Sequence, residues 1–268
     1  MRTFQIIIPV IVAGLTVSCS KDLMTPLDSS KIAVVESYIY AGDSVLKVKV
    51  SKLLPISDDT IDLNESVSGL NLLVNGKSLT ETDPGTYELS LGSQRIKPGE
   101  SYSVKFLYFS DTVSAVTTIP QKPSGFTSSA TTLYTSRITS TSGYPSGQMA
   151  EAELSWDNPD ESYYYLTVQY LDSVPDYINY KMADLDLPVK LSEPPTQTAG
   201  MRIGMRNLNF FGSYRLVLFK VNSDFTRLYE HVTSNSNNIT NPVTTISNGY
   251  GVFTGMSTDT IYLQVREN

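Results

Sequence analysis

Residues 97–120 read KPGESYSVKFLYFSDTVSAVTTIP and contain the pattern that recurs along the whole chain. The segment begins with Lys97-Pro98-Gly99-Glu100, a group of residues typical of a turn. Apolar and polar residues then alternate over 101–109, and a second extended segment follows at 112–119. Alternation places every second side chain on one face, here Tyr102, Val104, Phe106 and Tyr108. The segment therefore predicts two successive β-strands.

Strand patterns of the same kind precede this segment and are separated by short turns. We expect strands at 31–40, 45–50, 69–74 and 86–91. In 45–50, Leu46, Val48 and Val50 form a wholly aliphatic face, which we expect to face the core. Asn75-Gly76 predicts a tight hairpin, and Asp83-Pro84-Gly85 predicts a second turn. About seven short strands without a helix predict an Ig-like β-sandwich domain over residues 31–120.

The second half of the chain is also rich in strand patterns. Residues 121–147 contain Pro, Gly, Ser and Thr and are predicted to be a linker with extended edge structure. A second β-rich domain is predicted over 148–268, with strands at 148–156, 163–171, 201–208, 214–221 and 261–265. We expect Tyr163 and Tyr165 to pack into its core. Residues 172–200 are predicted to be an irregular insertion, because they contain several Pro and Asp residues.

One short helix is predicted at 223–233. Ser223 or Asp224 can cap its first turn, and Phe225, Leu228, Tyr229 and Val232 follow at helical spacing. The fold class is therefore all-β, a β-sandwich followed by a second β-rich domain with one helix.

The N-terminus has the pattern of a bacterial lipoprotein signal. An apolar run from Phe4 to Val17 follows Arg2, and Ser18 stands immediately before Cys19, the only cysteine of the chain. A run of this length is too short to span the roughly 30 Å hydrocarbon core of a bilayer as a helix. We therefore predict a cleaved signal peptide over 1–18, lipidation of Cys19, and a polar tether over 19–30. A secreted protein with a free thiol is the alternative interpretation.

Composition excludes several kinds of partner and chemistry. The formal net charge is −7 and no cluster of Lys and Arg occurs, so the chain is not expected to bind nucleic acid. The only histidine is His231, and no cysteine remains once Cys19 is lipidated. Catalytic triads, Cys–His pairs and His-rich zinc sites are therefore not expected. The acidic residues at 58–65 are interpreted as a solvated loop. We predict no metal, no cofactor and no enzymatic activity.

Two tyrosines in the predicted insertion are candidate ligand contacts. Tyr177 and Tyr180 lie in a segment that we expect to form loops on a rigid β-scaffold, where binding residues are commonly found.

Five segments share a recognisable order and spacing: 32–39, 69–74 with Gly85-Thr86-Tyr87, 97–102 with 115–120, 154–159 with 163–166, and Asn241-Pro242 with 247–253. Together they resemble a family of Bacteroidetes proteins, the domain of unknown function family 4249. The N-terminal half also resembles transthyretin-like sandwiches through residues 85–87 and 98–102. The family resemblance implies a lipoprotein often encoded beside a TonB-dependent outer-membrane receptor, with no established enzyme activity.

The C-terminal loop is the part of this resemblance that suggests a partner contact. The family usually has a Gly-Gly-x-Gly stretch before its final Phe, and this chain has one glycine fewer in Asn248-Gly249-Tyr250-Gly251, with Phe253 following. We interpret Asn248, Gly249, Tyr250, Gly251 and Phe253 as a candidate partner-contact loop.

Two functions remain open at this point. The first is an outward-facing, lipid-anchored outer-membrane protein that captures an unknown nutrient ligand for a TonB-dependent receptor. The second is a structural or adhesive surface protein of the fimbrillin type, in which the terminal strand, residues 260–265, is donated to a neighbouring subunit.

Overall fold

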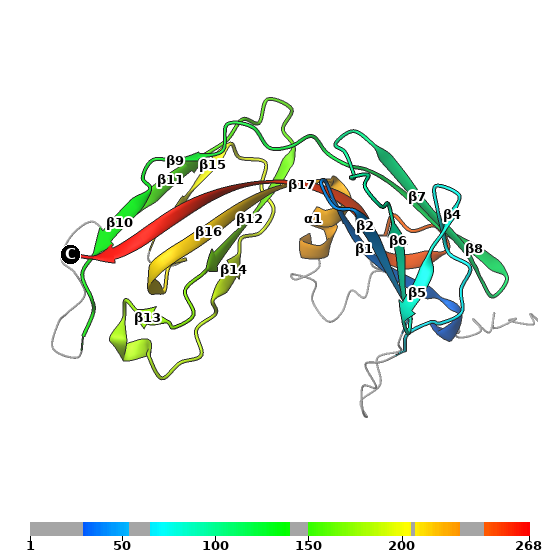
Figure 1. Ribbon diagram of the computed structural model, residues 1–268, viewed down its shortest axis with the longest axis horizontal. Helices are drawn as coiled ribbons and strands as arrows, with labels where there is room; N and C mark the ends of the chain where they lie inside the picture. The colour runs from blue at the N-terminus through cyan, green and yellow to red at the C-terminus, as the bar shows by residue number, and fades with distance from the viewer. Residues whose placement is uncertain (1–28, 54–64, 140–149, 205–206, 231–243) are drawn as a thin grey trace, which may run out of the picture.

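The computed structural model describes residues 29–53, 65–139, 150–204, 207–230 and 244–268. These residues form two lobes joined at one end, which give the molecule the outline of an arch (Figure 1). Each lobe has its own buried core, and we call them the N-terminal and C-terminal lobes. Cys19, the signal peptide, most of the acidic loop and His231 lie outside the described residues.

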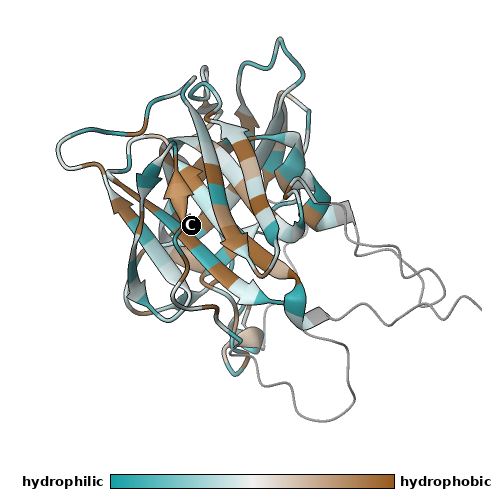
Figure 2. Ribbon diagram, turned by 90° about the vertical axis from the view of Figure 1, so that its right-hand side faces the viewer, coloured by the Kyte–Doolittle hydropathy of each residue, from teal (hydrophilic) through white to brown (hydrophobic). Residues whose placement is uncertain are grey.

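The N-terminal lobe is a β-sandwich, as predicted. A short 3-10 helix, η1 (Ser29–Lys31), leads into the first sheet. That sheet contains β1 (Ala33–Tyr40), β2 (Val45–Lys52), β6 (Thr86–Ser90) and β5 (Thr80–Asp83). The facing sheet contains β4 (Lys77–Ser78), β3 (Leu73–Val74), β7 (Ser101–Tyr108) and β8 (Asp111–Thr118). Teal and brown residues alternate along its strands in Figure 2, as expected when each strand has one buried face.

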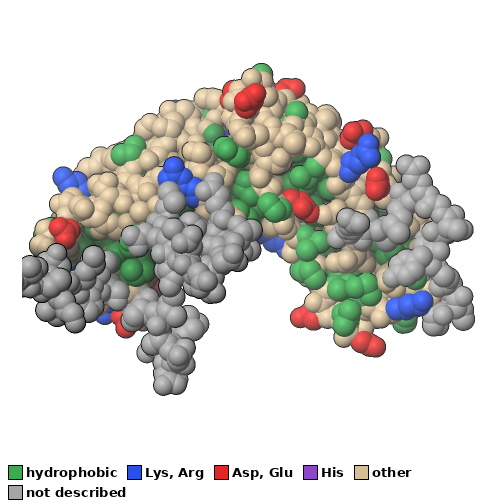
Figure 3. Space-filling view, turned by 180° about the vertical axis from the view of Figure 1, so that it is seen from behind, with side chains coloured by type: hydrophobic (Ala, Val, Ile, Leu, Met, Phe, Trp, Pro, Cys, Tyr) green, Lys and Arg blue, Asp and Glu red, His purple; other side chains and the backbone are tan. Residues whose placement is uncertain are grey.

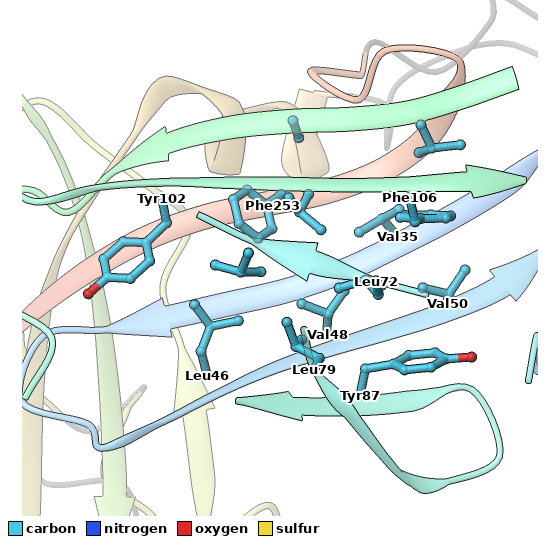
Figure 4. Close-up of a cluster of buried hydrophobic side chains, with 14 of the residues drawn as sticks. Val35, Leu46, Val48, Val50, Leu72, Leu79, Tyr87, Tyr102, Phe106 and Phe253 are labelled. Carbon is cyan, nitrogen blue, oxygen red and sulfur yellow. The ribbon is translucent and has the colours of Figure 1, made fainter. Parts of the chain in front are cut away.

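The core of this lobe is mainly aliphatic (Figure 4). Leu46, Val48 and Val50 are at most 1% exposed, which confirms the predicted core face of β2. Burying a side chain of this size contributes about 1.5–3 kcal/mol. The predicted hairpin is also present: Asn75 and Gly76 have φ angles of 49° and 76°, the positive values that a type I′ turn needs.

The C-terminal lobe is a second sandwich. Its larger layer contains β14 (Lys190–Ser192), β12 (Tyr163–Tyr170), β16 (Phe210–Val221), part of β17 (Gly249–Glu267) and β10 (Thr132–Thr135). Its smaller layer contains β15 (Gly200–Ile203), β11 (Ala152–Ser155) and β9 (Thr127–Ser128). Strand β13 (Asp176–Tyr177) pairs with β16, and the 3-10 helix η2 (Tyr180–Met182) follows it. The predicted insertion at 172–200 thus holds β13, η2 and β14.

Aromatic residues are more numerous in the C-terminal core than in the N-terminal core. Trp156, Tyr164, Tyr170, Phe210 and Tyr214 are all at most 5% exposed. The buried tyrosine hydroxyls are hydrogen bonded to the backbone. Tyr214 Oη donates to the carbonyl of Phe210 and accepts from its N–H, both at 2.8 Å. Burial raises the pKa of Tyr214 above its ordinary value. Each hydroxyl thus satisfies backbone groups that would otherwise be buried without a partner.

Strand β17 joins the two lobes. Its first part, Gly249–Met256, runs parallel to β1, and its second part pairs antiparallel with β16 from Met256 to Val265. Its last residues also pair with β10. The largest sheet among the described residues therefore has ten strands and extends through both lobes. The red ribbon of β17 crosses the whole arch in Figure 1.

This strand corrects the predicted domain organisation. The sequence predicts a terminal strand at 261–265 within a second domain that contains all of 148–268. In the structure, Ile246 and Phe253 belong to the core of the N-terminal lobe, and Phe253 is 0% exposed. The N-terminal sandwich is therefore completed by residues from the end of the chain.

The helix α1 (Ser223–Glu230) begins where predicted, directly after β16. It packs against the outer face of the large sheet, at the junction of the lobes (Figure 1). The all-β fold with one short α-helix is confirmed for the described residues.

Candidate functional site

An aromatic groove lies beside α1 at the junction of the lobes. It has a volume of about 450 Å³. We call this the aromatic groove; its main lining residues are Tyr38 and Tyr40 of β1, Tyr165 of β12, Phe219 of β16, Met256 of β17, and Phe225, Leu228 and Tyr229 of α1. Seen from behind, the molecule is hollowed between the lobes, and hydrophobic side chains gather at the top of this hollow (Figure 3).

Strand alternation explains why these rings share one face. On β1, Val35 and Ile39 point into the N-terminal core, so Tyr38 and Tyr40 lie on the opposite face. On β12, Tyr164 and Leu166 occupy the C-terminal core, which leaves Tyr165 on the outer face. The prediction that Tyr163 and Tyr165 pack into the main core was therefore wrong, because the alternate residues Tyr164 and Leu166 are the ones that point into it.

Tyr165 is the centre of the ring contacts. Its ring centroid lies 5.3 Å from that of Phe225, 5.6 Å from that of Phe219 and 6.0 Å from that of Tyr229. The rings meet at tilted or edge-on angles, which are the favoured geometries for aromatic pairs. Tyr40 extends the cluster through Phe219, at 6.2 Å. Rings from both lobes are thus in continuous contact.

Polar contacts hold α1 in place over the sheet. Asn222, just before the helix, donates from Nδ2 to the carbonyl of Thr118 at 2.9 Å and to Thr117 Oγ1 at 3.1 Å. Asp224 Oδ1 accepts from Thr254 Oγ1 at 2.8 Å. Burial raises the pKa of Asp224, and the hydrogen bonds from Thr254 and the backbone act against that rise. Strands β8 and β17 therefore fix the position of the helix.

The phenols of the groove are hydrogen-bond donors at neutral pH. Burial is the main cause that raises the pKa of Tyr38, Tyr40 and Tyr229 above the ordinary value for tyrosine. The contact with Tyr165 raises the pKa of Tyr229 further. A protonated phenol combines an apolar ring with a polar edge, so the groove can both stack on a ligand and hydrogen bond to it.

A polar depression continues from the aromatic groove along β1 and β2. It has a volume of about 540 Å³ and shares Tyr38 and Tyr40 with the groove. Its other lining residues include Glu36, Asp43 and the ion pair of Lys47 with Glu88, whose Nζ and Oε1 atoms are 2.7 Å apart. Burial raises the pKa of the Asp43 carboxyl. The combined surface is therefore mainly aromatic at one end, where Lys190 also lines it, and mainly charged at the other.

The lining residues of the groove and the depression include phenols, carboxylates and lysine ammonium groups. They include no histidine or cysteine among those described. Nor do the described ranges bring three or more His, Cys, Asp or Glu side chains together in a way that could hold a metal ion. A search of the same ranges finds no helix with the length and apolar character needed to cross a membrane.

The predicted ligand contacts Tyr177 and Tyr180 lie away from this groove. Tyr177 is half-buried, and its ring packs against Phe210 with centroids 5.1 Å apart. Tyr180 is 64% exposed in η2. The structure does not bring either residue together with the groove rings, so their role as contacts stays a prediction.

The predicted partner-contact loop has a structural role in β17. Gly251 has φ +107°, and a Cβ there would lie 2.0 Å from the carbonyl oxygen of Val35. A Cβ at Gly249 would lie 2.9 Å from the carbonyl oxygen of Ala33. Asn248 donates to the carbonyl of Thr112 at 2.9 Å. Since Phe253 is fully buried, its prediction as a contact residue is corrected, while Tyr250 remains half-exposed.

The fold and the groove define an all-β protein of two sandwich lobes with an aromatic groove at their junction. The family model described as "Domain of unknown function (DUF4249)" matches residues 21–261. Because the match covers most of the chain, this protein belongs to the DUF4249 family, which confirms the resemblance found in the sequence.

Two solved structures align with this chain at low sequence identity. Domains A168–A170 of titin align at 10% identity and a TM-score of 0.20, covering 72% of this chain and 61% of that one. The FN1–FN3 domains of chicken CNTN1 align at 15% identity and a TM-score of 0.24, covering 85% and 64%. The chain thus spans less than two thirds of either, and such TM-scores support no functional conclusion. No curated protein matches the chain.

Proposed function

We propose that this protein is a lipid-anchored, non-enzymatic outer-membrane protein that captures a ligand for a TonB-dependent nutrient uptake system. The single observation that carries the ligand-capturing role is the aromatic groove at the junction of the lobes. The membrane anchor rests on the sequence pattern around Cys19, and the receptor partner rests on membership of the family.

The groove has the properties of a ligand site. Such sites occur preferentially where two domains meet, and they combine apolar walls with a few polar groups. Here β1 contributes Tyr38 and Tyr40 from one lobe, and β12 and β16 contribute Tyr165 and Phe219 from the other. A large aromatic surface left partly exposed on a folded protein usually marks an interaction site.

The chemistry of the lining indicates the class of ligand. Aromatic faces stack on flat or apolar molecular surfaces, and the phenols donate hydrogen bonds to oxygen acceptors. The adjoining polar depression adds Glu36, Asp43 and Lys49. We therefore expect a small ligand with at least one apolar face and several hydrogen-bonding groups at its edge.

The partner can be tested with protein purified from its own membrane. The native lipidated chain is isolated from detergent-solubilised outer membranes, and the proteins that co-purify are identified by mass spectrometry. Co-purification of a TonB-dependent receptor supports the proposal. Recovery of the chain alone, or as a ladder of multimers, contradicts the receptor role.

The groove can be tested by a variant with a matched control. Leu228 and Tyr229 are 45% and 37% exposed, so the double variant L228N/Y229S changes the groove wall with little loss of core packing. Tyr134 is 55% exposed on β10 and does not line the groove, which makes Y134S the control. A panel of oligosaccharides, peptides and aromatic chelators is screened for an increase in melting temperature.

We expect a ligand that stabilises the wild type and Y134S to lose about two- to tenfold in affinity for L228N/Y229S, since stacking on one ring contributes about 0.5–1.5 kcal/mol beyond its burial. Equal affinity for all three proteins would place the ligand elsewhere on the molecule.

The structural-subunit alternative depends on the terminal strand. In the folded chain, residues 260–265 of β17 pair with β16, and Gln264–Glu267 also pair with β10. Both edges of this part of β17 are therefore occupied at its end, and donation to a neighbour would require those pairs to break. A ladder of multimers in the purification would favour this alternative.

A further inference from the structure

The β7–β8 hairpin presents an unusual apolar tip. Tyr108 pairs with Asp111, so Phe109 and Ser110 form a two-residue turn. Phe109 is 60% exposed, and Leu107 beside it is 63% exposed. Phe109 also has φ +51°, a left-handed value that favours Gly or Asn and is rare for bulky residues. An exposed aromatic residue thus occupies a position where a small polar residue would have a lower conformational free energy.

The start of the described chain lies beside this tip. Tyr108 Oη donates to the carbonyl of Ser30 at 2.8 Å, which ties η1 to the end of the hairpin. In Figure 1, the blue start of the chain reaches the same corner of the N-terminal lobe as the turn between β7 and β8. The tether from Cys19 therefore joins the folded protein next to Phe109.

The length of the tether limits how far the tip can move from a membrane. Fully extended, the residues between Cys19 and Ser30 reach at most roughly 40 Å, at about 3.3–3.6 Å per residue. A chain of this length that is fixed at one end keeps the attached surface at high effective concentration near the bilayer. The corner that carries Phe109 and Leu107 is the part of the lobe attached to it.

We propose that the tip formed by Leu107 and Phe109 rests in the interfacial region of the phospholipid bilayer that holds the lipidated Cys19. This proposal rests on the lipid anchor proposed above. Aromatic rings are favoured at the boundary between headgroups and acyl chains, where they bury an apolar surface about 5–10 Å deep. Lys105 lies on the same outward face of β7, two residues before Leu107, and its side chain can reach the headgroups. Ser110 and Asp111 limit the contact to a shallow one.

Tryptophan placed at the tip reports the contact directly. Phe109→Trp keeps an aromatic side chain at the turn, and Leu107→Trp provides a second tip position on regular strand backbone. Val116→Trp is the matched control, because Val116 is 67% exposed on β8 but pairs with Ser103, far along the hairpin from the turn. The native Trp156 is 4% exposed and supplies a constant background.

Each lipidated variant is reconstituted into phosphatidylcholine vesicles with or without bromine on the acyl chains. We expect brominated lipid to reduce the added emission at position 109 or 107 by about twofold, and at 116 by no more than about one tenth, because bromine quenches only rings that reach the acyl region. Equal quenching at the tip and at 116, or none at either tip position, would overturn the proposal.

Failure of the anchor is distinguished by the intact mass of the purified protein. A chain without the mass of a lipid group would contradict the proposed lipoprotein. A correctly lipidated chain that shows no quenching at the tip would contradict only the membrane contact. Phe109→Asn provides a stability check: since Asn tolerates the left-handed backbone, it should melt at or above the wild-type temperature.

Discussion

The two lobes are both β-sandwiches, but they are stabilised in different ways. The N-terminal core is built mainly from aliphatic side chains such as Val35, Leu46 and Val48. The C-terminal core contains more large aromatic residues, such as Tyr214, whose hydroxyl has its hydrogen-bond partners inside the protein. Trp156 Nε1 is buried without a partner among the described residues. The N-terminal core also contains a buried hydroxyl, Tyr87 Oη, which donates to the Val67 carbonyl at 2.7 Å. Lost volume should therefore affect both lobes, and lost hydrogen bonds should affect the C-terminal lobe at more positions.

The connections between strands also differ between the two lobes. Tight turns join neighbouring strands in the N-terminal lobe, as at Asn75-Gly76 and between β7 and β8. In the C-terminal lobe, long irregular segments separate β12 from β16. Despite these differences, β17 places both lobes in one sheet. Four predictions test how far the lobes differ and how strongly β17 couples them.

The largest effect is expected at Gly251, where β17 pairs with β1 in the N-terminal lobe. In Gly251→Ala the new Cβ would meet the Val35 carbonyl oxygen at 2.0 Å, and the backbone has φ +107°. Since neither backbone can move away without breaking the β1–β17 pairing, we expect a loss of more than about 5 kcal/mol in the free energy of unfolding.

The control is Gly92→Ala, which has φ +62° with nothing within 4 Å of the new Cβ. This variant should lose only about 1 kcal/mol of unfolding free energy, because the left-handed backbone conformation is the only feature that disfavours alanine there. Urea denaturation followed by circular dichroism compares the two variants. Similar losses in both would mean that β17 does not approach β1 as closely as described.

The second prediction concerns coupling between the lobes. Phe253→Ala removes a fully buried ring from the N-terminal core, which should cost about 3–5 kcal/mol. The chain has one tryptophan, Trp156, and it lies in the C-terminal core, so its fluorescence reports on that lobe. We expect Phe253→Ala to shift the fluorescence transition in urea, because β17 transmits the loss.

Phe210→Ala, in the C-terminal core, is the reciprocal variant and should shift the same transition. If Phe253→Ala leaves the Trp156 transition in place while circular dichroism shows earlier unfolding, the lobes unfold independently. That outcome would contradict the coupling.

The third prediction separates the two kinds of core. Tyr214→Phe keeps the ring but leaves the N–H and carbonyl of Phe210 without their 2.8 Å partner. We expect a loss of about 1–3 kcal/mol in unfolding free energy, the cost of unpaired buried polar groups. Tyr102→Phe is the matched change in the N-terminal lobe, where the hydroxyl donates to the exposed Glu100 at 2.9 Å.

That N-terminal variant should lose less than about 1 kcal/mol, since water can replace the hydroxyl at Glu100. Burial, followed by the Glu100 contact, raises the pKa of Tyr102 to about 12, so the phenol stays protonated throughout the measurement. Equal losses in the two variants would show that the C-terminal core does not depend specially on its hydroxyls.

The smallest effects are expected from two carboxyl groups with opposite pH dependence. The Arg137 guanidinium, 2.6 Å from Asp176, lowers the pKa of that carboxyl. Its contribution to stability is therefore present above the unfolded pKa and lost as pH falls through the lower folded pKa. Because this pair is partly exposed, it should contribute about 1 kcal/mol or less.

Asp224 should behave in the opposite way. Burial raises its pKa in the folded state, so its ionisation costs stability, and this cost is relieved as pH falls through the folded pKa towards the unfolded one. Melting temperatures between about pH 3 and pH 7 are compared for Asp176→Asn and Asp224→Asn. As the pH is lowered, the melting temperature of Asp176→Asn should fall less than that of the wild type, and that of Asp224→Asn should fall more. Changes of the same sign in both variants would contradict the assignment.

The N-terminal lobe was largely predictable from local patterns. The alternating apolar residues of β2 and β7, and the turn residues Asn75-Gly76, each specify their structure over a few neighbouring positions. The helix α1 was predictable for the same reason, since its apolar spacing lies within one short segment. Local patterns could not indicate that β17 continues from one lobe to the other.

The groove could not be found from the sequence because its rings come from four separate elements. Tyr38 lies on β1, Tyr165 on β12, Phe219 on β16 and Phe225 on α1. Alternation shows that Tyr38 and Tyr40 share a face, but it does not show which face of each strand points to a core. The wrong facing predicted for Tyr163 and Tyr165 is an example of that ambiguity.

Local chemistry along the chain was sufficient for the strand class, most turns and the α-helix of the described residues, because each depends on residues close together in sequence. The placement of Phe253 in the first core, the glycines of β17 against β1, and the aromatic groove depend on which distant strands pair. That choice is made by the burial of whole faces and by backbone contacts across the sheet, so only the folded chain reveals it.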